Sequence, residues 1–61
     1  MKVIFAVIDP NRDGFSHKKE FENYQLPIPR KGEAMILDEF IFEITRVEWY
    51  VEEDLVWVVA D

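Results

Sequence analysis

The chain of 61 residues has the length of one small domain, and it excludes the usual covalent and metal supports of such domains, because it has no cysteine and a single histidine. A hydrophobic content of 49% with nine aromatic residues predicts that residues 1–61 fold as one domain. No segment approaches the roughly 20 apolar residues that span a bilayer, and the apolar run after Met1 is too short for a secretory signal. The sequence therefore predicts a cytoplasmic protein with no membrane partner.

The net charge of −6 is unevenly divided along the chain. Residues 1–32 carry four acidic and six basic side chains, a net of +2, whereas residues 33–61 carry nine acidic side chains and one basic, a net of −8. An acidic surface repels phosphate backbones and attracts basic ones, so the second half disfavours nucleic acid and favours a basic protein partner.

The first half of the chain contains two predicted elements and a connector. Residues 2–8 are β-branched and aromatic, with both alternating sets apolar, which predicts a strand buried on both faces. The turn-forming string DPNRDG follows at residues 9–14. Residues 15–26 fit either a returning strand or a short helix capped by Ser16, and the strand is favoured because so short a helix gains little stability alone. The prolines and glycine of residues 26–32 predict an extended connector.

The acidic half contains three further predicted strands, at residues 34–37, 40–51 and 55–60, separated by turns at 38–39 and 52–54. The alternation of apolar residues within 40–51 changes phase, and a β-bulge near Thr45-Arg46 would restore it. One long helix over 39–59 also matches part of the apolar pattern. It leaves several aromatic and branched residues off its apolar face, so strands are favoured.

Five short strands with tight turns predict a mainly β protein. We expect a small antiparallel five-stranded barrel of the SH3-like or OB-like kind, closed on itself so that few strand edges are exposed. Because a barrel this small can pair edge to edge, both a monomer and a homodimer are compatible with the sequence.

Residues 9–20 match the written pattern of a calcium-binding loop. The loop positions one, three, five, six and twelve are occupied by Asp9, Asn11, Asp13, Gly14 and Glu20. No helix precedes the loop, however, and Asn-Arg-Asp-Gly is also ordinary hairpin material. Calcium binding through the Asp9–Glu20 loop is therefore an alternative function, and the sequence predicts no definite metal site and no cofactor.

No set of residues predicts catalysis. His17 lies beside two lysines without a nucleophile or metal-ligand constellation, which is typical of a solvated loop histidine. The paired carboxylates lie on predicted turns of a domain too small to enclose a substrate. We therefore predict a protein that is not an enzyme.

The predicted partner-binding residues gather around the turn at 52–54, where acids and aromatic residues alternate. They are Glu48, Trp49, Tyr50, Glu52, Glu53, Asp54 and Trp57. Exposed aromatic side chains ringed by carboxylates would suit a basic protein surface. The sequence does not decide which tryptophan is exposed.

The stretch IPRKGEAMILDEFIFEITRVEW, residues 28–49, combines a Pro-Arg-x-Gly-Glu turn, a short strand and an aromatic strand ending near Val-Glu-Trp. In these features it resembles small phage- or prophage-encoded β-barrel proteins of unknown function. The resemblance covers about a third of the chain and brings no catalytic or binding residues. It implies a small β barrel and the role of a phage accessory protein, such as an inhibitor of a host nuclease or defence complex.

The favoured function is thus a small acidic protein-interaction module that binds a basic protein surface. Calcium binding is the first alternative. The second is nucleic-acid binding through the basic half of the chain, by Arg12, Lys18, Lys19, Arg30 and Lys31.

Overall fold

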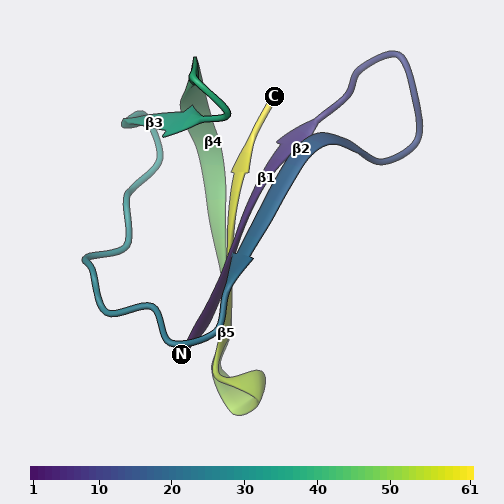
Figure 1. The fold of residues 1–61 in the computed structure, drawn as a ribbon. Coiled ribbons are helices and arrows are strands. Elements are labelled where there is room, and N and C mark those ends of the chain that lie inside the picture. Colours follow the sequence, from purple (N-terminus) through teal and green to yellow (C-terminus); the bar gives the residue numbers. More distant parts are fainter.

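A computed structural model describes all 61 residues and contains five strands and no α-helix (Figure 1). The strands are β1 (Lys2–Ile8), β2 (Phe15–Phe21), β3 (Ala34–Leu37), β4 (Phe40–Tyr50) and β5 (Leu55–Ala60), and a 3₁₀ turn, η1 (Val51–Glu53), joins the last two. The predicted mainly β class and the five predicted strands are confirmed. The strand alternative for residues 15–26 is confirmed for residues 15–21, which form β2, whereas residues 22–26 lie outside the strand.

The strands form one sheet in the order β2-β1-β5-β4-β3. Three of the pairings are antiparallel, but β1 and β5 run parallel at the centre of the sheet. The prediction of an entirely antiparallel sheet is therefore wrong at this pair. A parallel pair needs a long crossover between its strands, and the chain from β2 through the connector, β3 and β4 supplies one.

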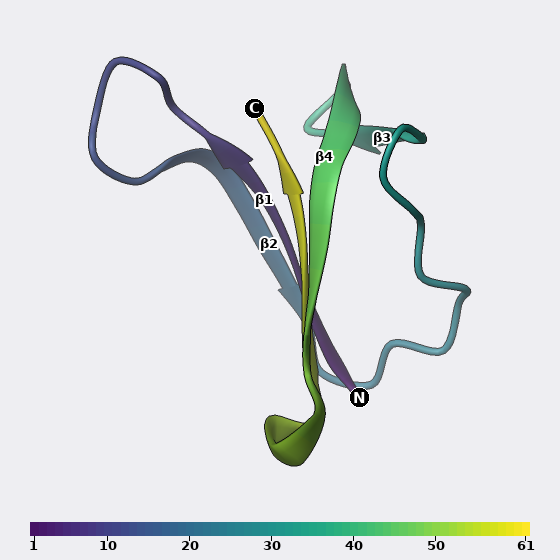
Figure 2. The same ribbon diagram turned by 180° about the vertical axis from the view of Figure 1, so that it is seen from behind.

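The sheet curls into a half-barrel and does not close. β2 and β3 lie at opposite edges of the sheet and each has one strand neighbour. Figures 1 and 2 show the β1–β2 pair and the β3–β4 pair diverging toward the end that carries the β1–β2 loop. The predicted closure of the barrel is thus wrong, because β2 and β3 form no ladder with each other.

The core lies on the inner face of the half-barrel. It consists of side chains from every strand except β2: Val3, Phe5, Val7, Met35, Leu37, Ile44, Val56, Val58 and Ala60. Tyr24, which follows β2, and Ile28 of the connector pack against this cluster. On the outer face Ile4, Ala6 and Val59 are buried as well. The prediction that residues 2–8 form a strand buried on both faces is therefore confirmed.

Two local features set the register of the acidic half. Ile44 is opposite Ala60 and Arg46 is opposite Val59, so Thr45 is the extra residue of a bulge, as predicted. Its hydroxyl donates a hydrogen bond of 3.2 Å to the carbonyl of Val59. Asp38 and Glu39, with φ of 50° and 73°, form the two-residue turn between β3 and β4.

Candidate functional site

The turn between β4 and β5 projects from one end of the half-barrel (Figure 1). Its 3₁₀ segment buries no residue, and Val51 at its start is 84% exposed. Glu52 and Glu53 follow, both exposed and without an ion pair among the salt bridges of the structure. We call Tyr50, Val51, Glu52 and Glu53 the acidic turn. In the acidic turn, the exposed apolar surface of Tyr50 and Val51 lies next to two glutamates that form no ion pair.

Glu48 of β4 supports the acidic turn from the sheet. One of its carboxylate oxygens lies 2.9 Å from Nε of Arg46, and the other accepts a hydrogen bond of 3.2 Å from the Tyr50 hydroxyl. That hydrogen bond and the charge of Glu48 raise the pKa of Tyr50. The Glu48 carboxylate therefore pairs with groups of its own chain, and its hydrogen bond with the Tyr50 hydroxyl orients the Tyr50 ring.

Asp54 ends the turn in the left-handed region, with φ of 52°. Its backbone carbonyl accepts a hydrogen bond of 3.1 Å from the Lys2 amide, and its carboxylate lies 3.7 Å from the N-terminal amine. Of the predicted acids, Asp54 thus fastens the turn to the start of β1. Glu52 and Glu53 are the ones left free.

The two tryptophans lie on opposite faces of the sheet. Trp57 is opposite Glu48 and Trp49 is opposite Val56, and neighbouring positions of a strand alternate between faces. Val56 belongs to the core cluster, so Trp49 lies on the inner side and Trp57 on the outer side. The structure therefore does not bring the predicted aromatic residues into one patch.

Trp57 is half-buried and serves the packing of the outer face. Its ring centroid lies 5.5 Å from that of Phe15, and the Lys18 ammonium lies 5.5 Å above the indole. Ala6 and Val59 of the same face are buried. Trp49, in contrast, is 58% exposed.

Trp49 borders a hollow that sequence reasoning missed. The hollow has a volume of about 410 Å³ and is lined by Val47 and Trp49 of β4 and by residues 28–31 of the connector, Ile28, Pro29, Arg30 and Lys31. The signal that was available is the Pro-Ile-Pro-Arg-Lys-Gly string, whose prolines extend the chain and whose glycine allows it to turn. Nothing in the sequence placed that string beside Trp49.

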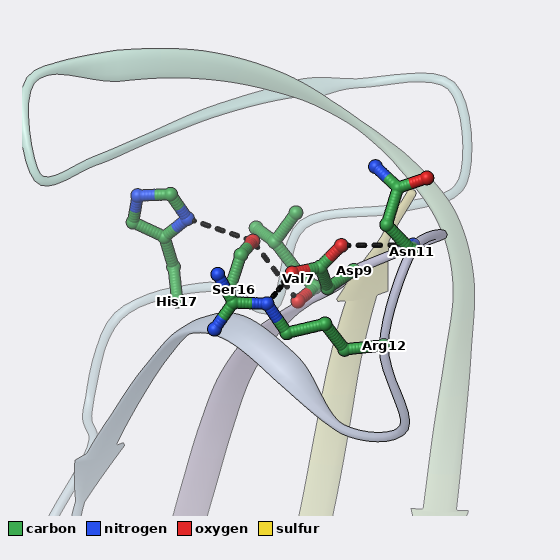
Figure 3. Close-up of polar contacts among 6 residues, drawn as sticks. All are labelled: Val7, Asp9, Asn11, Arg12, Ser16 and His17. Atoms are coloured by element: carbon green, nitrogen blue, oxygen red, sulfur yellow. Dashed lines mark hydrogen bonds and ion pairs between the residues drawn. The ribbon is translucent and has the colours of Figure 1, made fainter.

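The β1–β2 loop has the geometry of a hairpin turn (Figure 3). The Asp9 carboxylate accepts a hydrogen bond of 2.9 Å from the Asn11 amide and lies 3.5 Å from Nε of Arg12. Glu20 is opposite Ile4 in the ladder, five residues from Asp9 along β1, or about 17 Å at roughly 3.3 Å per residue. The structure thus does not bring Glu20 to the loop, and it contains no group of three or more potential metal ligands.

His17 is a strand residue and not the solvated loop residue that the sequence predicts. It is half-buried on β2, and its ring centroid lies 5.1 Å from Phe42 and 5.9 Å from Phe40. Its Nδ1 is 3.0 Å from Oγ of Ser16, which in turn donates to the carbonyl of Val7 (Figure 3). His17 therefore packs across the opening of the half-barrel.

A second and larger hollow, of about 720 Å³, lies where that opening is not bridged. Phe21 of β2 is on one side, Met35 and Leu37 of β3 are on the other, and Tyr24, which follows β2, lines it between them. Phe5 forms its floor, in edge contact with Phe21 and Tyr24. The hollow is mostly apolar and continues into the core.

The basic half of the chain does not form one patch. Ion pairs engage Lys18 with Glu20 at 3.5 Å and Lys19 with Asp38 at 3.3 Å. These two lysines are neighbours on β2 and point to opposite faces. Of the five residues of the nucleic-acid alternative, the structure brings only Arg30 and Lys31 together beside an exposed aromatic ring.

No protein-family model, curated protein or solved structure matches the chain. The structure contains no helix with the length and apolar character needed to cross a membrane.

Proposed function

We propose that the protein is a small, non-enzymatic interaction module that binds a basic protein surface through the acidic turn. The observation that carries the proposal is the adjacency of exposed apolar side chains and unpaired carboxylates on one projecting turn. Val51 and Tyr50 are 84% and 42% exposed, and Glu52 and Glu53 follow them directly.

The acidic turn has the two components of a protein-binding surface. Apolar area at Tyr50 and Val51 would be removed from water on binding, and Tyr is among the residues that contribute most to interface energy. Glu52 and Glu53 would pair with lysine or arginine of the partner and direct its approach. Trp49 and Trp57 lie outside this surface, because one faces the hollow beside the connector and the other packs under Lys18.

A phage-encoded inhibitor, the role that the resemblance of residues 28–49 implies, would use such a turn to occupy a basic groove of a host protein. Carboxylates on a projecting turn can take the place of phosphates in a groove that normally holds nucleic acid. The partner under this proposal is a protein with a positively charged cleft.

The test compares two double variants with the same change in net charge. Glu52→Gln with Glu53→Gln neutralises the acidic turn, and Glu39→Gln with Glu43→Gln neutralises two exposed, unpaired glutamates elsewhere. The tagged wild type captures partners from a host lysate at low salt, and the affinity of each purified partner is then measured by calorimetry for all three proteins.

We expect a basic partner that the acidic-turn variant binds at least about tenfold more weakly, while the control variant binds as the wild type does. High salt should weaken the complex, because exposed charge pairs are screened. Equal losses of affinity in the two double variants would show a general effect of net charge and would contradict the proposal. The absence of any basic partner would contradict it as well.

A further inference from the structure

The hollow beside Trp49 is bounded on two sides by different kinds of side chain. Trp49 and Val47 of β4 present apolar surface, and Arg30 and Lys31 of the connector present positive charge. Trp49 is 58% exposed, so more than half of its surface is accessible to a ligand. The hollow therefore joins an aromatic platform to two cations.

Arg30 and Lys31 differ from every other basic side chain of the protein. Each of the other five forms an ion pair with a carboxylate: Lys2, Arg12, Lys18, Lys19 and Arg46. Arg30 and Lys31 form none, and both are exposed. In a chain with almost twice as many acids as bases, the only two unpaired cations lie in the same hollow as the exposed tryptophan.

Hydrogen bonds fix the backbone of the turn that carries these two cations. The carbonyl of Arg30 accepts a hydrogen bond of 3.0 Å from the Glu33 amide, and the Glu33 carboxylate accepts one from the Arg30 amide. Gly32, with φ of 90°, occupies the turn position that requires a positive φ. Its amide donates to the carbonyl of Ile44 at 2.8 Å, and the Ile44 amide donates to Glu33 at 2.9 Å. The turn is thus attached at Ile44 to β4, the strand that also carries Trp49.

We infer that this hollow binds a single nucleotide, with its base stacked on Trp49 and its phosphate between Arg30 and Lys31. A planar ring joined to an anion is the chemistry that an exposed indole and two unpaired cations complement. A volume of about 410 Å³ is in the range of small-molecule sites. The net charge of −6 repels long polyanions, so the ligand carries few phosphates, either as a free nucleotide or as the end of a single strand.

The test is a titration of the full chain, followed by amide and indole NMR resonances, with adenosine monophosphate and with a short thymidine oligonucleotide as separate probes. We expect shifts at the Trp49 indole and at the amides of Arg30, Lys31 and Gly32. Binding of the mononucleotide identifies a free nucleotide as the ligand, and binding of the oligonucleotide alone identifies a strand end.

Four variants separate the contribution of stacking from that of charge and from a general effect on the fold. Trp49→Ala should weaken binding about tenfold or more, and Trp49→Phe should restore most of it because it keeps an aromatic face. Arg30→Ala with Lys31→Ala should remove binding, whereas Arg12→Ala, which changes an exposed cation of the β1–β2 loop, should leave it within about twofold.

Three results would overturn the inference. They are NMR shifts confined to other residues, equal losses of affinity in Arg12→Ala and the double variant, and no shift with either probe. A short polyglutamate peptide that binds at these residues where neither nucleotide does would also overturn it, because the hollow would then recognise an acidic peptide. None of these results bears on the acidic turn, since none of the variants alters Tyr50–Glu53.

Discussion

The ion pair between Lys2 and Glu20 shows how single residues fasten the edge of the sheet. Nζ of Lys2 lies 2.9 Å from the Glu20 carboxylate and 3.8 Å from that of Glu22. The hydrogen bond and the charge of Lys2 lower the pKa of Glu20 below its ordinary value of 4.5, and Glu20 in turn raises the pKa of Lys2 above 10.5. Both shifts favour the charged, paired state that joins β1 to β2.

These shifts predict a pH dependence of stability. The contribution of Glu20 is fully present above its unfolded pKa and is lost as the pH falls through its lowered folded pKa. The free energy of unfolding of Glu20→Gln should therefore be lower than that of the wild type at pH 7, with the difference shrinking as the pH falls below about 4. At the alkaline end the difference should shrink again as the pH rises through the raised pKa of Lys2. Urea denaturation of both proteins across this range measures the difference.

Glu22→Gln is the matched control for Glu20→Gln, because its carboxylate is farther from Lys2 and more exposed. We expect its stability to follow that of the wild type closely at every pH. A difference between Glu20→Gln and the wild type that stays constant from acid to neutral pH would contradict the assigned role of the ion pair.

At the scale of single residues, the sequence predicted which residues of one strand share a face. It did not predict which face of one strand lies on the same side of the sheet as a given face of its neighbour. The bulge at Thr45 was predictable from the change of phase between Ile44 and Val47. The opposite orientations of Trp49 and Trp57 were not predictable, because they depend on how many residues the β4–β5 turn inserts between the paired strands. The 3₁₀ turn and the left-handed Asp54 decide that number.

The two-residue turn between β3 and β4 is an element with built-in strain. Asp38 and Glu39 both have positive φ, which residues with a side chain adopt at a cost of about 1 kcal/mol or more. Asp38 gains an ion pair with Lys19 across the opening of the half-barrel, whereas Glu39 has no such contact. The position of Glu39 is therefore the one at which glycine should be preferred.

Glu39→Gly should raise the free energy of unfolding by about 0.5–1 kcal/mol, since the relief of strain exceeds the added entropy of glycine in the unfolded chain. Chemical denaturation measures the change. Glu43→Gly, in the regular part of β4, is the contrasting substitution and should destabilise the protein. A loss of stability in Glu39→Gly would show that the turn is not strained in the way described.

At the scale of elements, all five strands follow from local patterns of β-branched and aromatic residues and from their turn signals. The pairing of β1 with β5 does not, because it joins the two ends of the chain and depends on where the connector carries β3. The location of the connector also decides that Arg30 and Lys31 lie beside Trp49. Long-range placement of this kind leaves no periodic signal in the sequence.

The whole molecule is a single curled sheet with β2 and β3 as its two edges. Side chains lie between these edges, and no backbone ladder joins them. Contacts of His17 with Phe42 and of Lys19 with Asp38 bridge one part of the opening. Composition predicted the amount of apolar surface, but whether the sheet closes depends on strand lengths and twist, and β3 has only four residues. The half-barrel is therefore a property of the assembled molecule.

At this scale the two faces of the sheet have separate tasks. Trp57 packs with Phe15 and Lys18 on the outer face, and Trp49 lies on the inner side, where it borders a hollow together with the connector. The acidic turn projects from the end between them. The proposed partner surface and the proposed nucleotide site are therefore distinct, and the nucleotide site depends on the separation of Trp49 from Trp57.

The most direct test of this separation is a set of nuclear Overhauser effects from the two indole rings of the unmodified protein in solution. We expect contacts of Trp57 with Phe15 and Lys18 and contacts of Trp49 with the connector at residues 28–31, with none between the two indoles. Contacts between Trp49 and Trp57, or contacts of both rings with the same side chains, would contradict the register of β4 and β5 and the two surfaces derived from it.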